Sequence, residues 1–292
     1  DGVEVKYAAI IYGDYYYAFN TVDEAIKFDK TKTIVLLRDA TIGTEGTYTI
    51  DVNGHNLSAA EGYKVTNSGT TWTVAEKQAY RVYVLDNCGW TKKIHAWTSG
   101  TNGDVNITGD WNSTSISKSA TVNGFSFAYY EFDKNYDGKT VNYIISNNGD
   151  DYWRKEYNNI VLNSDKYYRI NAVGEIIEIN PNDLSTFKFT LYIYDQSNVN
   201  ATHSLYYAST ATGTAQAESG RVGYNWKNYD YFILDGSKIG TDFKVSVKDN
   251  NGKTITNLSI SKSIKTDLCI GYYNNSGGKG YWANGTTPYT SL

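Results

Sequence analysis

The stretch VNYIISNNG (residues 141–149) shows the pattern on which the fold depends, β-branched and aromatic side chains followed by an Asn-Asn-Gly turn. Such side chains suit the pleated surface of a strand, and Asn and Gly tolerate the positive φ of a tight turn. The same strand composition recurs at 80–85, 140–145, 189–194 and 243–247. Turn pairs of the Asn-Gly or Asp-Gly type lie at 53–54, 123–124, 137–138 and 251–252. The sequence therefore predicts a mainly β protein.

The pattern also repeats along the chain. Residues 141–149 align with 244–252, KVSVKDNNG, at an offset of 103 residues. The opening strands of the two segments align at an offset of about 108 to 110, which indicates a divergent repeat with small loop differences. Polar residues interrupt the alternation near 76–78 and 180–183. We therefore predict a small N-terminal mixed β/α domain at 1–77, then two tandem antiparallel β-sandwich modules at 78–181 and 182–292.

One helix is expected, in the N-terminal domain. Thr21 and Glu24 have the spacing of a capping box and precede Ala25, Ile26 and Phe28. The predicted helix spans residues 21–30.

Composition excludes several classes of function. The chain has 292 residues and a formal net charge of −4, and its lysines are scattered, so no basic patch for nucleic acid is present. Its longest apolar runs are about five residues, far below the roughly 20 that a membrane-spanning helix needs. Two cysteines 181 residues apart and three isolated histidines give no metal-ligand spacing, so we expect neither a metal nor a cofactor. The unusual feature is the 15% aromatic content.

Several of these aromatic residues occur in a recognisable order. The chain reads YVLDN at 83–87, Gly-Trp at 89–90, IHAW at 94–97, Trp111, and IISNNG at 144–149. This order resembles the family 26 starch-binding modules, over about 100 residues. The resemblance implies a β-sandwich that binds starch, amylopectin and maltooligosaccharides without cleaving them. Here His95 stands where the family commonly has Tyr, and Asp150-Asp151-Tyr152 follows the turn in place of Gln-Thr.

The resemblance assigns His95, Trp97 and Trp111 to an aromatic platform. His95 and Trp97 are two residues apart, which on a strand places both side chains on one face about 6 to 7 Å apart, suited to adjacent sugar units. Trp111 would close the platform from a loop, and Lys92, Asn148 and Asp151 are candidate partners for sugar hydroxyls. In the second module we expect the platform among Tyr206, Tyr207 and Trp226. The alternative for each aromatic side chain is packing within a core.

The N-terminal segment carries a second resemblance. IDVNGHNL at 50–57 is similar to repeats of Gram-positive bacterial surface proteins. The resemblance implies a spacer or scaffold domain, with His55 in a turn, on a secreted or cell-surface protein. The two modules would tether such a protein, or a cell-surface complex of it with amylases, to starch.

No residues suggest catalysis. Asp150 and Asp151, and Asp133 and Asp137, lie on predicted turns, where carboxylates are usually solvated, so we expect no enzyme. Residues 133–138 copy the first half of a calcium loop, but Ile144 stands where a bidentate Glu is needed, so a hairpin turn is predicted. The alternative function is a surface adhesin or assembly module whose exposed aromatic side chains bind a protein.

Overall fold

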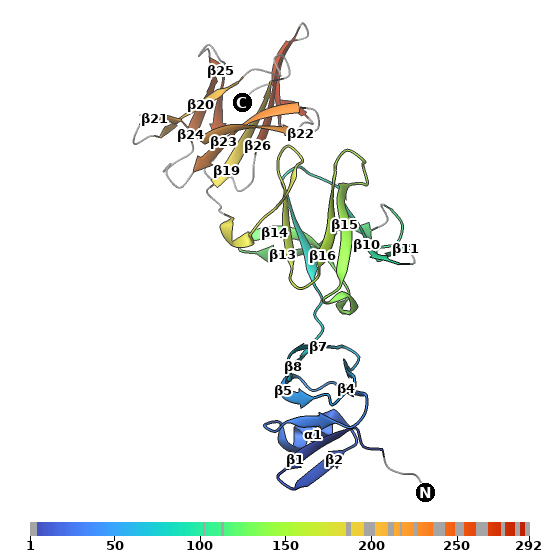
Figure 1. Cartoon of the computed structure of the whole chain (residues 1–292). Coiled ribbons are helices and arrows are strands. Elements are labelled where there is room, and N and C mark those ends of the chain that lie inside the picture. The colour runs from blue at the N-terminus through green and yellow to red at the C-terminus, as the bar shows by residue number, and fades with distance from the viewer. Residues whose placement is uncertain are drawn as a thin grey trace. The chain divides into compact units, whose positions relative to one another are not determined.

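The computed structural model confirms the mainly β fold (Figure 1). It describes residues 5–101, 103–111, 114–184, 188–195, 202–209, 213–216, 218–224, 227–235, 243–248, 254–260, 268–275, 278–283 and 287–289. The chain divides into two compact units. Unit 1 contains Asp1–Tyr80 and Phe132–Lys139, and unit 2 contains Arg81–Glu131 and Thr140–Leu292. The boundary predicted near residue 181 lies inside unit 2 and stays a prediction.

Unit 1 is a mixed β/α structure. Its strands are β1 (Ala8–Tyr12), β2 (Tyr15–Phe19), β3 (Ile34–Leu36), β4 (Ala40–Ile42), β5 (Gly46–Asp51), β6 (Leu57–Ala59), β7 (Tyr63–Ser68) and β8 (Thr71–Glu76). Six of them form a sheet in the order β2-β1-β3-β5-β8-β7, while β4 and β6 pair in parallel. The core gathers buried side chains of the sheet and the helix, among them Ile10, Ile34 and Ile26.

The one α-helix of the described residues is α1 (Val22–Asp29). Thr21 is its N-cap, and the Thr21 hydroxyl accepts a hydrogen bond from the Glu24 N–H at 3.1 Å, as the capping box predicts. In a capping box the Glu carboxylate accepts from the N–H of the N-cap residue. Here the Glu24 carboxylate accepts from the N–H of Asn20, the residue before Thr21. The helix ends near its predicted end.

The N-terminal part of unit 2 forms two five-stranded sheets. Its strands are β9 (Arg81–Asp86), β10 (Lys92–Gly100), β11 (Gly103–Asn106), β12 (Thr114–Ser115), β13 (Lys118–Val122), β14 (Phe125–Glu131), β15 (Thr140–Asn147), β16 (Arg154–Val161), β17 (Lys166–Ile170) and β18 (Ile176–Glu178). One sheet has the order β11-β10-β15-β16, with β12 beside β10, and the other β13-β14-β9-β17-β18. We call this pair the first sandwich.

Tyrosines fill much of the interior of the first sandwich. Tyr143 of β15 and Tyr168 of β17 are both fully buried, and their hydroxyls lie 2.5 Å apart across the two sheets. Burial raises the pKa of Tyr168 to about 12. Tyr157 packs on Tyr168 with ring centroids 4.5 Å apart. The paired hydroxyls hydrogen-bond each other, which removes the cost of burying them alone. Part of the aromatic excess therefore serves the core.

The remaining strands of unit 2 form two further sheets. They are β19 (Lys188–Asp195), β20 (Ser204–Ser209), β21 (Gly213–Gln216), β22 (Glu218–Tyr224), β23 (Lys227–Asp235), β24 (Phe243–Lys248), β25 (Thr254–Ile260), β26 (Leu268–Asn275), β27 (Gly278–Ala283) and β28 (Thr287–Tyr289). Their orders are β22-β23-β19-β26-β27-β28 and β21-β20-β24-β25. We call this pair the second sandwich.

Both sandwiches have the same strand connectivity. β9 lies between antiparallel β14 and parallel β17, and β19 lies between antiparallel β23 and parallel β26. The run β11-β10-β15-β16 corresponds in the same way to β21-β20-β24-β25. β15 begins at residue 140 and β24 at residue 243, so their starts differ by the 103 residues of the sequence alignment. The shared topology makes strand positions in the two sandwiches directly comparable.

The segment between β14 and β15 belongs to unit 1. It contains the 3-10 helix η1 (Lys134–Tyr136), which the Asp133 side chain caps by accepting from the Asn135 N–H. The fully buried Asp137 carboxylate pairs with the Lys64 ammonium at 2.8 Å and accepts from the Gln78 N–H. The half calcium loop of the sequence is thus a capped 3-10 turn whose second carboxylate is bound to a lysine. The predicted hairpin is wrong, because β14 and β15 lie in different sheets and do not pair.

Candidate functional site

The platform predicted on residues 94–97 begins with the alternation of β10. Ile94 and Ala96 are buried toward the interior of the first sandwich, at 1% and 0% exposed. Because side chains alternate along a strand, His95 and Trp97 share the outer face of the sheet. Their rings are stacked, with centroids 5.4 Å apart and planes inclined by 29°. The structure thus places these two predicted residues side by side.

Trp111 reaches the same place from a loop. After β11, Thr108 accepts a hydrogen bond from the Ala96 N–H through its hydroxyl at 2.8 Å, and the chain then returns to pair β12 with β10. This path brings the Trp111 ring to 5.4 Å from the His95 ring, edge to face at 67°. Trp111 is 36% exposed. Three aromatic rings therefore form one surface from two separate segments.

A charged pair borders this surface. The guanidinium of Arg154 lies 5.3 Å from the centre of the Trp111 ring, a cation–π contact. Arg154 also pairs with the exposed carboxylate of Asp151 at 3.2 Å. Asp151, predicted as a hydroxyl partner, is therefore linked to the platform through Arg154. Because the pair is exposed to solvent, it contributes little to stability and stays available to a ligand.

β15 lies beside the platform strand. Asn142 is the register partner of Trp97 and Ile144 that of His95, so their side chains lie on the same outer face. Both are under 8% exposed, covered from solvent. The Asn142 side chain donates to the Ser99 hydroxyl at 3.1 Å and accepts from the Asn159 N–H at 2.8 Å. This bonding fixes a polar group beside Trp97 and links β10 to β15.

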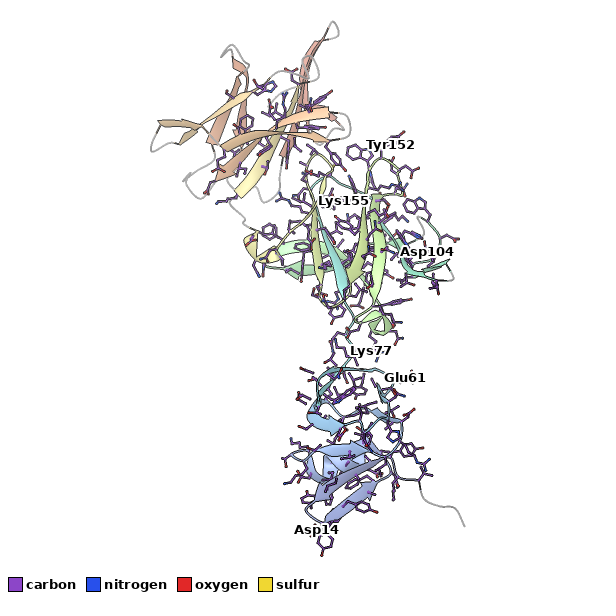
Figure 2. All side chains as sticks on the ribbon, viewed as in Figure 1. Asp14, Glu61, Lys77, Asp104, Tyr152 and Lys155 are labelled. Atoms are coloured by element: carbon purple, nitrogen blue, oxygen red, sulfur yellow. The ribbon has the colours of Figure 1, made fainter. Side chains whose placement is uncertain are left out.

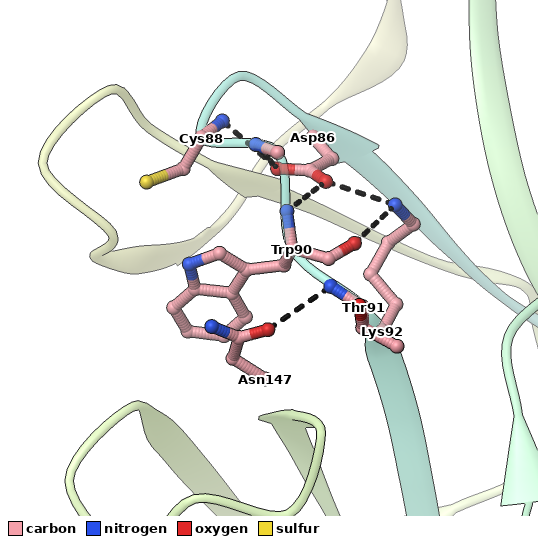
Figure 3. Close-up of polar contacts among 7 residues, drawn as sticks. Asp86, Cys88, Trp90, Thr91, Lys92 and Asn147 are labelled. Carbon is pink, nitrogen blue, oxygen red and sulfur yellow. Dashed lines mark hydrogen bonds and ion pairs between the residues drawn. The ribbon is translucent and has the colours of Figure 1, made fainter. Parts of the chain in front are cut away.

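Lys92 lies away from the platform. Lys92 is two residues before Ile94 and four before Ala96, so its side chain lies on their face of the sheet, opposite to that of His95. Figure 3 shows its ammonium bound to the Asp86 carboxylate at 2.8 Å and to the Trp90 carbonyl at 3.0 Å. Lys92 therefore stabilises the turn that leads into β10, and we do not include it in the binding surface proposed below.

The Asn-Asn-Gly turn of 147–149 holds the start of β10. The Asn147 side chain accepts from the Thr91 N–H at 3.0 Å (Figure 3), and the N–H of Asn148 donates to the Thr91 carbonyl at 2.7 Å. Asn148 has φ of 50°, the left-handed conformation that Asn tolerates. Its side chain is exposed. The turn motif therefore has a structural role, and the Asn148 amide can still meet a ligand.

Three polar residues of the outer face were missed. Lys93 precedes His95 by two residues, so it lies on the platform face, and Arg154 and Glu156 of β16 are the register partners of Ser146 and Ile144 on that face. Alternation alone could have identified Lys93 in place of Lys92. The approach of Arg154 to Trp111 depends on a loop path that alternation does not encode.

The second sandwich offers a related position on β20. Trp97 pairs with Asn142, and Tyr207 pairs with Val245, which lies 103 residues after Asn142. By the same register Leu205 has the position of His95 and Tyr206 that of Ala96. The structure describes only the backbone of Tyr206 and Tyr207, and Trp226 lies outside the described residues.

The acidic residues singled out in the sequence have local partners. Asp150 accepts from the N–H groups of Tyr152 and Trp153, Asp151 binds Arg154, and Asp133 and Asp137 have the partners given above. Within the described ranges, no group of three or more His, Cys, Asp or Glu side chains could hold a metal ion. Tyr152, which follows Asp151 in the chain and is labelled in Figure 2, is 72% exposed.

Among the described residues, α1 has only eight residues, too few to cross a bilayer.

No protein-family model and no curated protein matches the chain. Similar solved structures include family 41 carbohydrate-binding modules from streptococcal virulence factors, which recognise α-glucan, with TM-score 0.23 and 10% identity over 66% of this chain and 93% of theirs. A proposed adhesin of Bacteroides ovatus gives 0.24 and 9%, over 72% and 94%. A proposed cell adhesion protein of Bacteroides fragilis gives 0.21 and 9%, over 69% and 86%. TM-scores this low carry no argument about function, so the proposal below depends on the geometry of the site.

Proposed function

We propose that the first sandwich binds α-1,4-glucan, in starch, amylopectin or maltooligosaccharides, without cleaving it. The observation that carries this proposal is the stacked pair of His95 and Trp97, which Trp111 extends on the outer face of one sheet. A pyranose ring has apolar faces and a polar rim, so it is recognised by flat rings beside hydrogen-bonding groups. The rings supply the first of these requirements.

The inclination of the rings favours an α-linked chain. The planes of His95 and Trp97 differ by 29°, and Trp111 stands at 67° to His95. A curved glucan presents successive sugar faces at different angles, whereas a flat β-linked chain suits coplanar rings. We propose that Asp151 and Asn148 accept or donate hydrogen bonds to sugar hydroxyls beside these rings.

The biological role that we propose is attachment. The two sandwiches would tether a secreted or cell-surface bacterial protein, or its complex with amylases, to starch. The acidic side chains near the platform hold backbone N–H groups or a guanidinium. That bonding suits a turn and a binding edge better than a pair of catalytic carboxylates.

The test is calorimetric titration of the full chain with maltoheptaose and with cellohexaose. We expect binding of the α-linked sugar in the μM to mM range. Trp97→Ala should lower that affinity about 30-fold, because loss of a Trp at the centre of a binding surface often costs about 2 kcal/mol. Tyr15→Ala, at a 77% exposed tyrosine of unit 1, is the matched control and should bind normally. Equal binding of both sugars, or an unaffected Trp97→Ala variant, would contradict the proposal.

The alternative function, adhesion to a protein, is favoured by one surface of unit 1. Tyr16 of β2 and its register partner Ile11 are 71% and 57% exposed and share one face of the sheet, whereas Tyr15 and Tyr17 lie on the other face. Exposed aromatic and apolar side chains in such a group are typical of protein interfaces. A chain that is silent toward both sugars in the titration would favour this alternative.

A further inference from the structure

A cavity of about 480 Å³ opens in unit 1. It lies between the start of α1, the β4–β6 pair and the residue before β1, and we call it the α1–β4 pocket. Its lining includes aromatic and polar side chains: Tyr7, Asn20, Asp39, Thr41, Asn56 and Ser58. The volume falls within the roughly 300 to 1,000 Å³ typical of small-molecule sites. No residue of the aromatic platform contributes to it.

One wall of the pocket is a pair of hydroxyl groups. Thr41 of β4 and Ser58 of β6 are register partners in a parallel pair, and both side chains are exposed on the same face. The Ser58 hydroxyl donates to the Ala40 carbonyl at 3.3 Å, which leaves its lone pairs directed outward as acceptors. The wall can therefore both donate to and accept from a hydroxylated ligand.

A fixed carboxylate and amide continue this wall. Asp39 accepts from the N–H of Asn56 at 2.8 Å and from its side-chain amide at 3.3 Å. These hydrogen bonds, with the nearby His55, lower the pKa of Asp39. Both side chains are held before a ligand arrives, which reduces the entropy lost on binding.

Tyr7 gives the pocket an aromatic side. It is 37% exposed, and its backbone is bound on both sides, through its N–H to the Phe19 carbonyl and through its carbonyl to the Leu37 N–H. The fully buried Val22 adds apolar surface at the start of α1. An aromatic residue together with hydroxyl, amide and carboxylate groups in one pocket is the combination that a sugar ring requires.

The charges of the pocket argue against an anion. Asp39 and Asp23 both line it. At the helix N-terminus the Glu24 N–H already donates to the Thr21 hydroxyl, and the Glu24 carboxylate, which accepts from the Asn20 N–H, adds a further negative charge nearby. The acids do not favour a cation either, because Asp23 already accepts from the N–H groups after β4.

We propose that the α1–β4 pocket binds one or two units of a neutral saccharide. The sugar face lies against Tyr7, and its hydroxyls bond to Thr41, Ser58 and Asn56. This site is independent of the glucan platform on the first sandwich.

The test uses the full chain in the Trp97→Ala background, which weakens the platform. Glucose, galactose, mannose and maltose, with glucose 6-phosphate as the anionic comparison, are titrated and followed by saturation-transfer NMR. We expect at least one neutral sugar to bind at millimolar concentration and to exceed glucose 6-phosphate. Thr41→Val removes one hydroxyl at nearly constant shape and should weaken binding about fivefold. Tyr7→Ala should weaken it further, and Thr66→Val, at an exposed threonine of β7 outside the pocket, should not.

Two results would overturn the proposal. The first is no binding of any of the four neutral sugars, or stronger binding of glucose 6-phosphate. The second is binding that Thr41→Val and Tyr7→Ala both leave unchanged in variants that keep the unfolding temperature of the parent. Maltoheptaose titration of the chain with Trp97 intact reports on the platform separately, so the two proposals can fail independently.

Discussion

His203 lies buried between two carboxylates of the second sandwich. Its Nδ1 is 2.5 Å from Asp230, and its Nε2 is 3.3 Å from Asp195. Arg221 binds the other oxygen of Asp230 at 2.8 Å. Burial alone would lower the pKa of His203, but the hydrogen bonds and charges of Asp230 and Asp195 raise it above the ordinary 6.5. With Arg221 and a protonated His203, two positive charges offset the negative charges of Asp230 and Asp195.

This arrangement predicts a stability that depends on pH. Because the pKa of His203 is raised in the folded state, its contribution is full below about pH 6.5 and is lost as the pH rises through the folded pKa. Although burial opposes the change, the bonds to His203 and Arg221 lower the pKa of Asp230, whose contribution is full above about pH 3.8 and is lost in acid. The second sandwich should therefore be most stable between about pH 4 and 6.5.

The measurement is the unfolding temperature of the chain from pH 4 to 9, for the parent and for His203→Gln. The variant should lose the decline on the alkaline side. Tyr15→Ala, at an exposed tyrosine of unit 1, is the control and should keep the parent profile. Parallel profiles for the parent and His203→Gln would contradict the assignment.

Residues of the platform show where sequence reasoning succeeds at this scale. His95 and Trp97 come together because a two-residue spacing on a strand fixes a common face. The same alternation puts Lys92 on the opposite face of β10 and Lys93 on the face of His95 and Trp97. Trp111 and Arg154 meet because a loop and a neighbouring strand bring them there, and no local rule encodes such contacts. The resemblance to a known family assigned Trp111 to the platform, whereas no feature of the sequence pointed to Arg154.

At the scale of elements, periodicity predicted the strands well but not their partners. The alternation of 141–147 matches β15, and the Thr21 cap matches the start of α1. The parallel pairs β9–β17 and β19–β26, however, join segments more than 70 residues apart. Such pairing follows from packing of the whole sandwich, which no sequence window contains.

The shared register of β10 and β20 predicts unequal binding by the two sandwiches. Tyr207 has the register position of Trp97, but Leu205 has that of His95, so the two β20 positions that match the stacked pair carry one aromatic residue instead of two. Trp97→Ala should therefore lower the affinity for maltoheptaose more than Tyr207→Ala does, by about fivefold or more. Calorimetric stoichiometry of the single and double variants measures this order. A larger loss from Tyr207→Ala would show that the register correspondence does not carry the function.

At the scale of the molecule, the chain passes through unit 1 twice. Residues 132–139, which separate β14 from β15 of the first sandwich, belong with the N-terminal 80 residues. A linear series of domains, as the sequence pattern suggests, does not include such a return. The turn at 133–138 gave no sign of this return in the sequence, because the partners of the Asp137 carboxylate, Lys64 and Gln78, are remote along the chain.

Asp137 makes this return testable. Its carboxylate is fully buried and binds the Lys64 ammonium and the Gln78 N–H, while the hydrogen bond to Asp137 raises the pKa of Lys64. Asp137→Ala leaves both groups without their acceptor and should destabilise unit 1 by about 2 kcal/mol, less than the 3 to 5 for a fully buried pair because Lys64 is 35% exposed. Asp133→Ala removes only the cap of η1 and should cost about 1 kcal/mol or less. Hydrogen exchange of the unit 1 amides compares the two variants, and equal protection in both would mean that Asp137 does not anchor the returning segment.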